Sequence, residues 1–94
     1  MRPGFEWDDL KAELNLRKHG LSFVAASDVF LDPDRIEMDA SRPGDGEQRR
    51  KVFGTVDGEF IAVVFVVRGD AVRLISARPA RRKEARHGDR PTYP

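Results

Sequence analysis

Two turn signals, one on each side of an apolar run, limit what the second half of this chain can form. Asp57-Gly58 precedes the run Phe60–Val67, and Gly69-Asp70 follows it. Asp-Gly between two strand patterns is typical of a type I′ hairpin turn, and Gly at the first central position suits type II′. The sequence therefore predicts a three-stranded antiparallel meander over residues 49–56, 59–68 and 71–78. Because Phe60–Val67 is apolar on both faces, we expect it to be the central strand.

The start of the chain predicts one short strand followed by a capped helix. Phe5-Glu6-Trp7 alternates between apolar and polar residues, as a half-buried strand does. Asp8 is suited to the N-cap of a helix over residues 9–19. Leu10 and Leu14 lie four residues apart, so we expect them together on the buried face of this helix.

A second helix and a fourth meander strand follow. Gly20 is suited to the left-handed position after the first helix, and Ser22 to the N-cap of the next. Apolar residues at helical spacing then continue until Asp32-Pro33, which ends this second short helix. Residues 35–40 alternate between charged and apolar side chains, which predicts a half-exposed strand. Residues 41–48 contain proline and two glycines and are expected to form a loop.

Together these elements predict an α+β fold with the order β-α-α-β-β-β-β-α, an antiparallel meander sheet packed by helices. The last helix is expected over residues 80–87, after a break at Pro79. We expect a single domain over residues 1–94, with an ordered core over residues 5–87 and a flexible tail over residues 88–94. The two N-terminal helices can cover one face of the sheet, whereas the short last helix covers the other poorly. Such an apolar face favours a protein partner.

The net charge of +1 hides an asymmetry between the two halves of the chain. Residues 1–47 carry 6 basic and 11 acidic side chains, and residues 48–94 carry 11 basic and 5 acidic. This split indicates a polyanion-binding face in the second half. The alternative is that the charges only solvate a small surface.

Several classes of protein are excluded by what the sequence lacks. There is no cysteine, so disulfides, thiolate catalysis and cysteine zinc sites cannot form. There is no His-x-x-x-His pair, no calcium loop and no phosphate loop, so we expect no metal and no cofactor. The longest apolar run, Phe60–Val67, is too short to cross a bilayer, and the N-terminus has no signal-peptide pattern. A cytoplasmic protein without membrane association is therefore expected.

Two aromatic side chains in the first half are candidates for chemistry or binding. His19 follows Lys18 near the end of the first helix, where a cation is stabilised and the pKa of histidine is raised. His19 is thus the best single candidate for proton transfer, the alternative being a plain helix-end cation. Trp7 is the only tryptophan. It is either a core anchor or a platform on which a base stacks.

Arginines dominate the second half. Simple alternation in the strand 71–78 puts Ser76 and Arg78 on one face and Arg73 on the other. Guanidinium groups bind phosphate oxygens through two parallel hydrogen bonds, so these residues favour binding of a nucleic-acid backbone. The alternative is that they protect a strand-rich sequence from aggregation. The basic residues concerned are Arg49, Arg68, Arg73, Arg78, Arg81, Arg82, Lys83 and Arg86.

Four groups of residues, in a fixed order, cover about residues 5–86. They are Phe5-Glu6-Trp7-Asp8 with Lys11, Asn15, Lys18-His19-Gly20 and Ser22-Phe23; Ala26 with Val29-Phe30 and Asp32-Pro33; Gly46-Glu47-x-Arg49 with Gly54; and Arg73-x-Ile75-Ser76-Ala77-Arg78-x-Ala80. In order and spacing this pattern resembles the BrnT toxins of bacterial type II toxin–antitoxin systems. The resemblance implies a RelE-like fold and a ribonuclease that cleaves RNA and inhibits translation. It also implies a BrnA-like antitoxin as partner in a hetero-oligomer such as a heterotetramer, with operator DNA contacted only through that antitoxin.

RNA cleavage without a metal uses the 2′-hydroxyl of the substrate as nucleophile, so the enzyme needs proton-transfer groups and cations. On that basis we expect His19 or Glu47 to handle protons and Arg49 and Arg78 to stabilise the phosphate. The spacing of Glu47 and Arg49 puts both on one face at the strand entrance, if the strand extends that far. The alternative for these two is a structural ion pair. The expected RNA-binding residues are Trp7, Lys18, Arg73, Arg81 and Arg82.

The C-terminal segment departs from the pattern of the family. Family members continue with a helix that carries Glu-Arg and then Tyr. Here Glu84 matches, Ala85 replaces the Arg, and His87 or Gly88 stands near the position of the Tyr. The alternative function is therefore a catalytically impaired module that binds nucleic acid or antitoxin, and a third class is a small structural domain without an RNA role.

Overall fold

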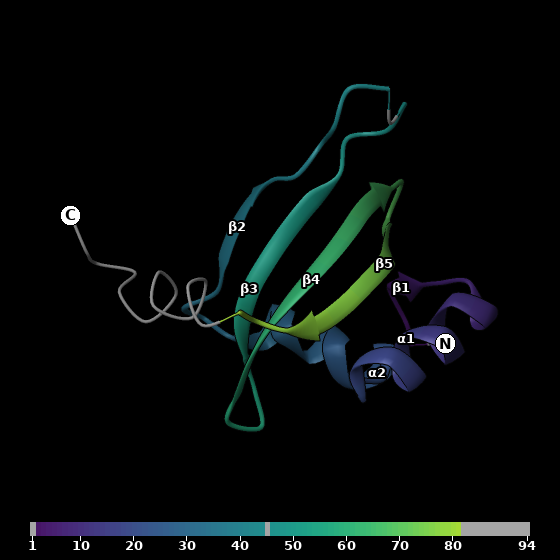
Figure 1. Ribbon diagram of the computed structural model, residues 1–94. Coiled ribbons are helices and arrows are strands. Elements are labelled where there is room, and N and C mark those ends of the chain that lie inside the picture. Colours follow the sequence, from purple (N-terminus) through teal and green to yellow (C-terminus); the bar gives the residue numbers. More distant parts are fainter. Residues whose placement is uncertain (1, 45, 82–94) are drawn as a thin grey trace.

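The computed structural model describes residues 2–44 and 46–81, which form a five-stranded sheet with helices on one face (Figure 1). The elements in chain order are β1 (Phe5–Glu6), α1 (Asp9–His19), α2 (Phe23–Ala26), the 3-10 helix η1 (Ser27–Leu31), β2 (Ile36–Asp39), β3 (Arg50–Val56), β4 (Glu59–Arg68) and β5 (Ala71–Pro79). Of the expected last helix over residues 80–87, only Ala80 and Arg81 are described. The rest of it and the tail over residues 88–94 lie outside the described residues. No helix within the described ranges is long and apolar enough to span a bilayer.

The sheet has the strand order β1-β5-β4-β3-β2. The α+β class and the antiparallel meander from β2 to β5 are confirmed, with β4 in the centre. The expectation of a purely antiparallel sheet is wrong, because β1 pairs with β5 in parallel. Between these two strands the chain passes through the helices to the far edge of the sheet and returns through the meander, and it is this long path that permits a parallel pair.

Both predicted turns have the expected backbone. Asp57 and Gly58 have φ angles of +50° and +81°, as a type I′ turn requires. At the other turn Gly69 has a φ of +57°, whereas Asp70 is not in the left-handed region, as in type II′. These two turns set the register of the meander, in which residues 59–68 form the longest strand.

The first helix has the predicted bounds and caps but not the predicted buried face. The Asp8 carboxylate accepts a hydrogen bond from the Lys11 backbone N–H, and Gly20 follows the helix with a φ of +70°. Leu10 and Leu14 are 64% and 53% exposed, so the expectation that they face the core is wrong. The side chain that α1 buries is Asn15, whose amide bonds to the backbone of β5. A polar residue thus takes the inward position that the leucine spacing suggested for apolar side chains.

The second helical segment divides into one α-turn and one 3-10 turn. Ser22 accepts a hydrogen bond from the Ala25 backbone N–H, which confirms the predicted N-cap. The segment ends at Asp32, and the carboxylate of Asp32 accepts a hydrogen bond from the Thr55 backbone N–H at 2.8 Å. This bond connects the end of η1 to β3.

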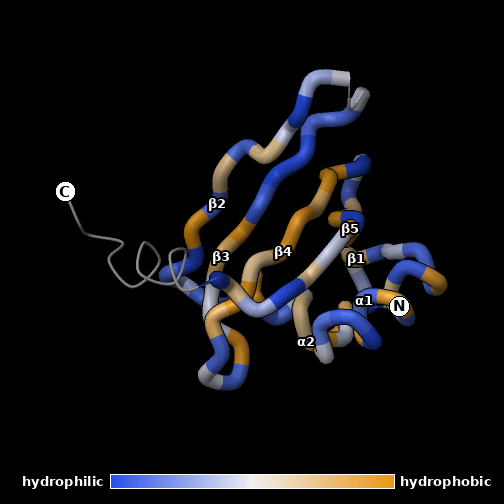
Figure 2. The backbone as a smooth tube through the Cα atoms, in the orientation of Figure 1, coloured by the Kyte–Doolittle hydropathy of each residue, from blue (hydrophilic) through white to orange (hydrophobic). Residues whose placement is uncertain are grey.

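The hydrophobic core lies between the helices and one face of the sheet. β4 is apolar along most of its length, whereas β2 and the start of β3 are more polar (Figure 2). The core consists of Trp7, Phe23, Ala26, Val29, Val52, Val56, Ile61, Val63, Phe65, Leu74 and Ala77. We call the opposite side of the sheet the distal face. Within the described residues no helix lies on it.

Candidate functional site

A β-bulge in β5 decides which arginines share a face. The pairs Val66–Arg73, Val64–Ser76 and Ala62–Arg78 join β4 to β5, with a register shift between Val64 and Phe65. Residues directly opposite in an antiparallel pair lie on the same face, and these three β4 residues alternate with the core residues. Arg73, Ser76 and Arg78 therefore all lie on the distal face. The expectation that Arg73 points the other way is wrong, because Ile75 is the extra residue of the bulge.

The distal face also carries aromatic and apolar side chains. The rings of Phe53 and Phe60 are stacked, with centroids 6.2 Å apart and planes 11° from parallel. The ammonium group of Lys51 lies 5.8 Å from the centroid of the Phe53 ring. A face with stacked rings beside a row of cations can bind bases and phosphates together.

Glu47 lies in the loop before β3 rather than on the strand. β3 begins at Arg50, so the strand does not extend to Glu47 or Arg49, and the condition for the two to share a strand face is not met. The Glu47 carboxylate accepts hydrogen bonds from Arg68 Nε at 2.9 Å and Arg68 Nη2 at 2.8 Å. Arg49 is fixed at the loop base, where its backbone N–H donates to Ser41 Oγ at 2.9 Å.

Several charges meet around Glu47. The hydrogen bonds from Arg68, together with the charges of Arg68, Arg73 and Arg49, lower the pKa of Glu47 below its ordinary value of 4.5. The same contact with Glu47 raises the pKa of Arg68. The Glu47 carboxylate is therefore ionised at neutral pH and is a weak proton acceptor.

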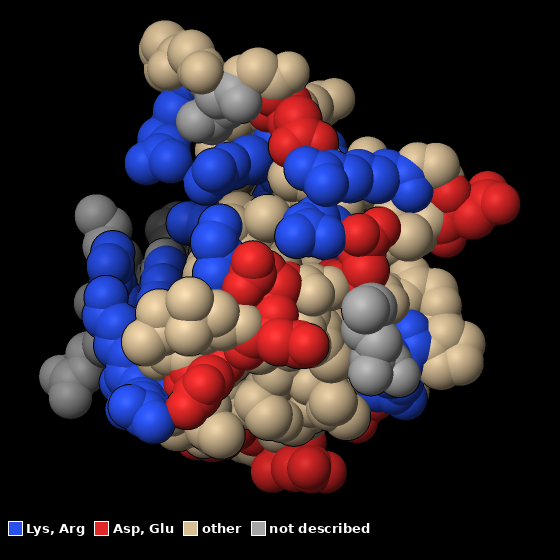
Figure 3. All heavy atoms as spheres, turned by 90° about the vertical axis from the view of Figure 1, so that its right-hand side faces the viewer, with Lys and Arg blue, Asp and Glu red and all other residues tan. Residues whose placement is uncertain are grey.

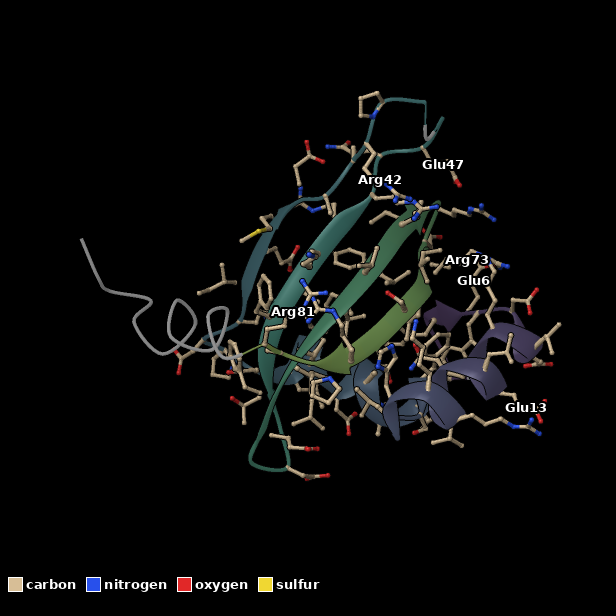
Figure 4. All side chains as sticks on the ribbon, in the orientation of Figure 1. Glu6, Glu13, Arg42, Glu47, Arg73 and Arg81 are labelled. Carbon is tan, nitrogen blue, oxygen red and sulfur yellow. The ribbon has the colours of Figure 1, made fainter. Side chains whose placement is uncertain are left out.

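Arg73 has a carboxylate partner on the neighbouring strand. Its Nη1 donates a hydrogen bond to Glu6 Oε2 at 2.8 Å, across the parallel pair of β1 and β5. Glu6, Arg42, Glu47 and Arg73 lie toward the same end of the sheet, where Lys and Arg atoms are interleaved with Asp and Glu atoms (Figures 3 and 4). We call Glu6, Glu47, Arg49, Arg68 and Arg73 the charge cluster.

His19 is the last residue of α1, and the positive charge of Arg78 on β5 reaches it. Partial burial and the positive charges of Lys18 and Arg78 lower the pKa of His19 below its ordinary value of 6.5. The expectation that the helix end raises this pKa is wrong, because desolvation and two nearby cations outweigh the helix dipole. The imidazole is consequently neutral at pH 7 and can accept a proton. The structure thus divides the expected catalytic residues between two places, with His19 and Arg78 apart from Glu47 and Arg49.

The remaining expected RNA-binding residues have different surroundings. Trp7 is only 8% exposed and packs edge-on against Phe23, with ring centroids 5.9 Å apart. The core-anchor alternative describes Trp7, and an indole buried in this way does not offer a face to a base. Lys18 and Arg81 are exposed, and Arg81 lies near the other end of the sheet from Glu47 (Figure 4). Arg82 lies outside the described residues.

Two members of the charge cluster were not among the expected site residues. Arg68 holds Glu47, and Glu6 holds Arg73. The sequence marks Arg68 only as one of several basic residues of the second half, directly before the Gly69-Asp70 turn, and Glu6 becomes a candidate only once β1 is known to pair with β5. Within residues 2–44 and 46–81, no group of three or more His, Asp or Glu side chains could hold a metal ion.

Comparison with known proteins identifies a family that this chain matches. The family model described as the ribonuclease toxin BrnT of type II toxin–antitoxin systems matches residues 7–84. This match spans α1, both turns and the whole of β5. A comparison with curated proteins finds no match.

Proposed function

Because the chain belongs to the BrnT family of ribonuclease toxins of type II toxin–antitoxin systems, we propose that it cleaves single-stranded RNA on the distal face of its sheet and thereby inhibits translation. The observation that carries this proposal is the bulge at Ile75, since it adds Arg73 to the face that holds Ser76 and Arg78. The guanidinium groups can bind the phosphates of a single RNA strand, and the stacked rings of Phe53 and Phe60 beside them can contact its bases.

The proposed reaction needs no metal ion. A base removes the proton of the 2′-hydroxyl, and the 2′-oxygen attacks the neighbouring phosphorus. The bond to the 5′-oxygen breaks, that oxygen takes a proton from water, and a 2′,3′-cyclic phosphate remains. Arg78 stabilises the extra negative charge on the phosphorane as it develops.

Of the two expected proton acceptors, the surroundings favour His19. A neutral imidazole that the charge of Arg78 reaches can take a proton from RNA that passes the edge of β5, where α1 meets this strand. Glu47 is engaged by Arg68, and its lowered pKa weakens it as a base. We therefore assign the proton-accepting role to His19 and a positioning role to Lys18 beside it.

The family implies an antitoxin as partner. We propose a BrnA-like antitoxin that forms a hetero-oligomer with this chain and lays acidic residues across Arg49, Arg73 and Arg78. Inhibition would then be competitive with RNA, because one set of cations serves both partners. Adding antitoxin should abolish RNA binding, and Arg78→Glu should weaken the affinity for RNA and for antitoxin together.

The test is cleavage of an end-labelled single-stranded RNA by the purified chain in EDTA. The proposal predicts products with 2′,3′-cyclic phosphate ends, a strong loss of rate in His19→Gln and Arg78→Gln, and full activity in the control Arg17→Gln. Arg17 is an exposed arginine that pairs with Glu13 on α1, so the control removes the same charge away from the distal face.

Two results would contradict the proposed mechanism. Activity that EDTA abolishes and Mg²⁺ restores would exclude the metal-independent reaction. RNA binding without cleavage under any condition would favour the alternative function, a binding module that has lost catalysis through the departures at Ala85 and Gly88.

A further inference from the structure

We propose that Arg68 and Arg73 form a phosphate-binding subsite, and that in the free protein the carboxylate of Glu47 occupies it in place of a phosphate. This inference deepens the proposed function and rests on it where it takes the phosphate to be that of RNA. On this view a phosphate of the incoming RNA displaces the carboxylate of Glu47 from Arg68. Glu47 is then neither a base nor a simple structural partner but a competitor for the substrate.

The geometry of the contact is the first argument. Arg68 donates two hydrogen bonds to the two carboxylate oxygens of Glu47, at 2.8 and 2.9 Å. A phosphodiester presents a similar pair of charged oxygens to a guanidinium group, and arginine binds both kinds of group in this two-bonded way. A side chain already oriented for a carboxylate is therefore oriented for a phosphate.

The surrounding charge is the second argument. The charges of Arg68, Arg73 and Arg49 all reach Glu47 and favour its ionised form. Glu6 engages one of these three arginines, Arg73. Loss of Glu47 from the cluster therefore removes a negative charge that Arg68 and Arg73 both reach, which favours binding of an anion in its place.

The ease of displacement is the third argument. Both side chains of the Glu47–Arg68 pair are about half exposed, at 46% and 47%. Ion pairs this exposed to solvent contribute little to folding stability, so exchanging the partner costs little. Glu47 belongs to the loop that the hydrogen bonds between Ser41 and Arg49 close. It can therefore move without breaking the pairing of β2 and β3.

Space beside the pair is the fourth argument. A pocket of about 240 Å³ is lined by Glu47, Gln48, Arg50, Val66 and Val67. It is smaller than the usual pockets for whole small-molecule ligands, which measure about 300–1,000 Å³. The pocket borders Glu47 and leaves room for its side chain to move away from Arg68.

The chain contains a matched control for this proposal. Glu13 and Arg17 form a second exposed carboxylate–guanidinium pair, also at 2.8 Å, on the outside of α1. Replacing Glu13 or Glu47 by Gln changes the net charge by the same amount and frees one arginine in each case. Only the Glu47 substitution frees an arginine in the charge cluster.

The experiment measures the affinity of each variant for a 2′-O-methyl oligoribonucleotide, which lacks the nucleophile and cannot be cleaved. Glu47→Gln should bind this probe about 2- to 5-fold more tightly than the wild type, the fold-change expected when a weak exposed ion pair no longer competes. Glu13→Gln should bind with nearly wild-type affinity. Adding Arg68→Gln to Glu47→Gln should remove the gain.

Other outcomes would overturn the inference. Equal gains in Glu47→Gln and Glu13→Gln would show an effect of net charge alone. Unchanged probe affinity in Arg68→Gln would remove Arg68 from the RNA path. Lost cleavage of natural RNA in Glu47→Gln, with no change in probe affinity, would make Glu47 the base instead.

A second measurement separates this inference from the proposed function. The Arg68 Nε–H signal is followed by NMR in the wild type and in Glu47→Gln while inorganic phosphate is added. If the wild type neither binds nor cleaves RNA, the proposed function fails. The subsite is still supported if phosphate moves this signal at lower concentration in Glu47→Gln, and it is overturned if phosphate moves it in neither protein.

Discussion

Asn15 shows how one side chain can connect a helix to a sheet edge. Its Nδ2 donates hydrogen bonds to the carbonyl oxygens of Ala77 and Leu21, at 2.8 and 3.0 Å, and its Oδ1 accepts one from the Ala77 N–H at 3.1 Å. β1 pairs with β5 only as far as Arg73. The amide of Asn15 therefore takes the place of a neighbouring strand for the part of β5 that carries Arg78.

We predict that Asn15→Leu lowers the free energy of unfolding by about 1–3 kcal/mol, because it leaves the buried N–H and C=O of Ala77 without partners. Urea denaturation followed by far-UV circular dichroism measures this change. The neighbouring substitution Leu14→Gln, at an exposed position, is the control and should have little effect. Equal stability of Asn15→Leu and the wild type would contradict the role given to this side chain.

Gly54 is the second residue on which the packing depends. A Cβ atom at this position would lie 2.7 Å from Val29 Cγ2 and 3.1 Å from Asp32 Oδ2. We predict that Gly54→Ala destabilises the fold by about 1–3 kcal/mol through overpacking. Thermal unfolding should show a lower Tm, and Val29→Ala in the same chain should recover part of the loss. A Tm unchanged by Gly54→Ala would be inconsistent with this close approach.

His19 gives the proposed reaction its pH dependence. The imidazole is a base only when it is neutral, and its pKa lies below 6.5. We predict that kcat/KM rises with pH, with its midpoint below 6.5, and is constant above about pH 7. Initial rates of RNA cleavage, measured from about pH 4.5 to about pH 8, give this profile, because that range covers the titration of a histidine. A midpoint well above 6.5 would assign the step to another group.

At the scale of the elements, helix α1 has an apolar pattern that does not mark its buried face. Leu10 and Leu14 point to solvent, and Asn15 points to the sheet. We predict that Leu10→Gln with Leu14→Gln changes the free energy of unfolding by less than about 0.5 kcal/mol for each substitution. Chemical denaturation of the double variant tests this. A large decrease in the free energy of unfolding would show that the two leucines are packed in the core.

The strongest local signals in the sequence predicted most of the elements. Asp57-Gly58 and Gly69-Asp70 specified two turns, and Asp8, Gly20 and Ser22 specified helix caps, because each of these depends on backbone conformation within a few residues. These signals are sufficient for the meander, its central strand and the bounds of α1.

Features that depend on distant residues were not predictable in the same way. The bulge at Ile75 depends on how β5 packs against β4, and simple alternation put Arg73 on the wrong face. The parallel pairing of β1 and the contact of Glu47 with Arg68 join segments far apart in sequence. The lowered pKa of His19 depends on Arg78, a residue of another element. For these reasons the sequence alone could not predict which of the candidate residues lie together.

At the scale of the whole molecule, the charge asymmetry of the sequence becomes a cationic row on one face of the sheet. We predict that the logarithm of the RNA association constant falls linearly with the logarithm of salt concentration, by about 0.7 for each phosphate contact with a single strand. Arg73→Gln and Arg78→Gln should each reduce this slope by about 0.7, whereas Arg17→Gln should leave it unchanged. Fluorescence anisotropy over a range of salt concentrations gives the slopes. An affinity independent of salt would rule out backbone recognition by these cations.

The pairing of β1 with β5 has a consequence for synthesis of the protein on the ribosome. Phe5 pairs with Val72, so the first strand is made long before its partner. At about 5–20 residues per second, the interval between them is on the order of 3–13 s. During this time the emerging chain has no completed sheet, and Arg73, Ser76 and Arg78 do not yet exist as a row. The finished sheet therefore forms only after β5 has emerged from the ribosome.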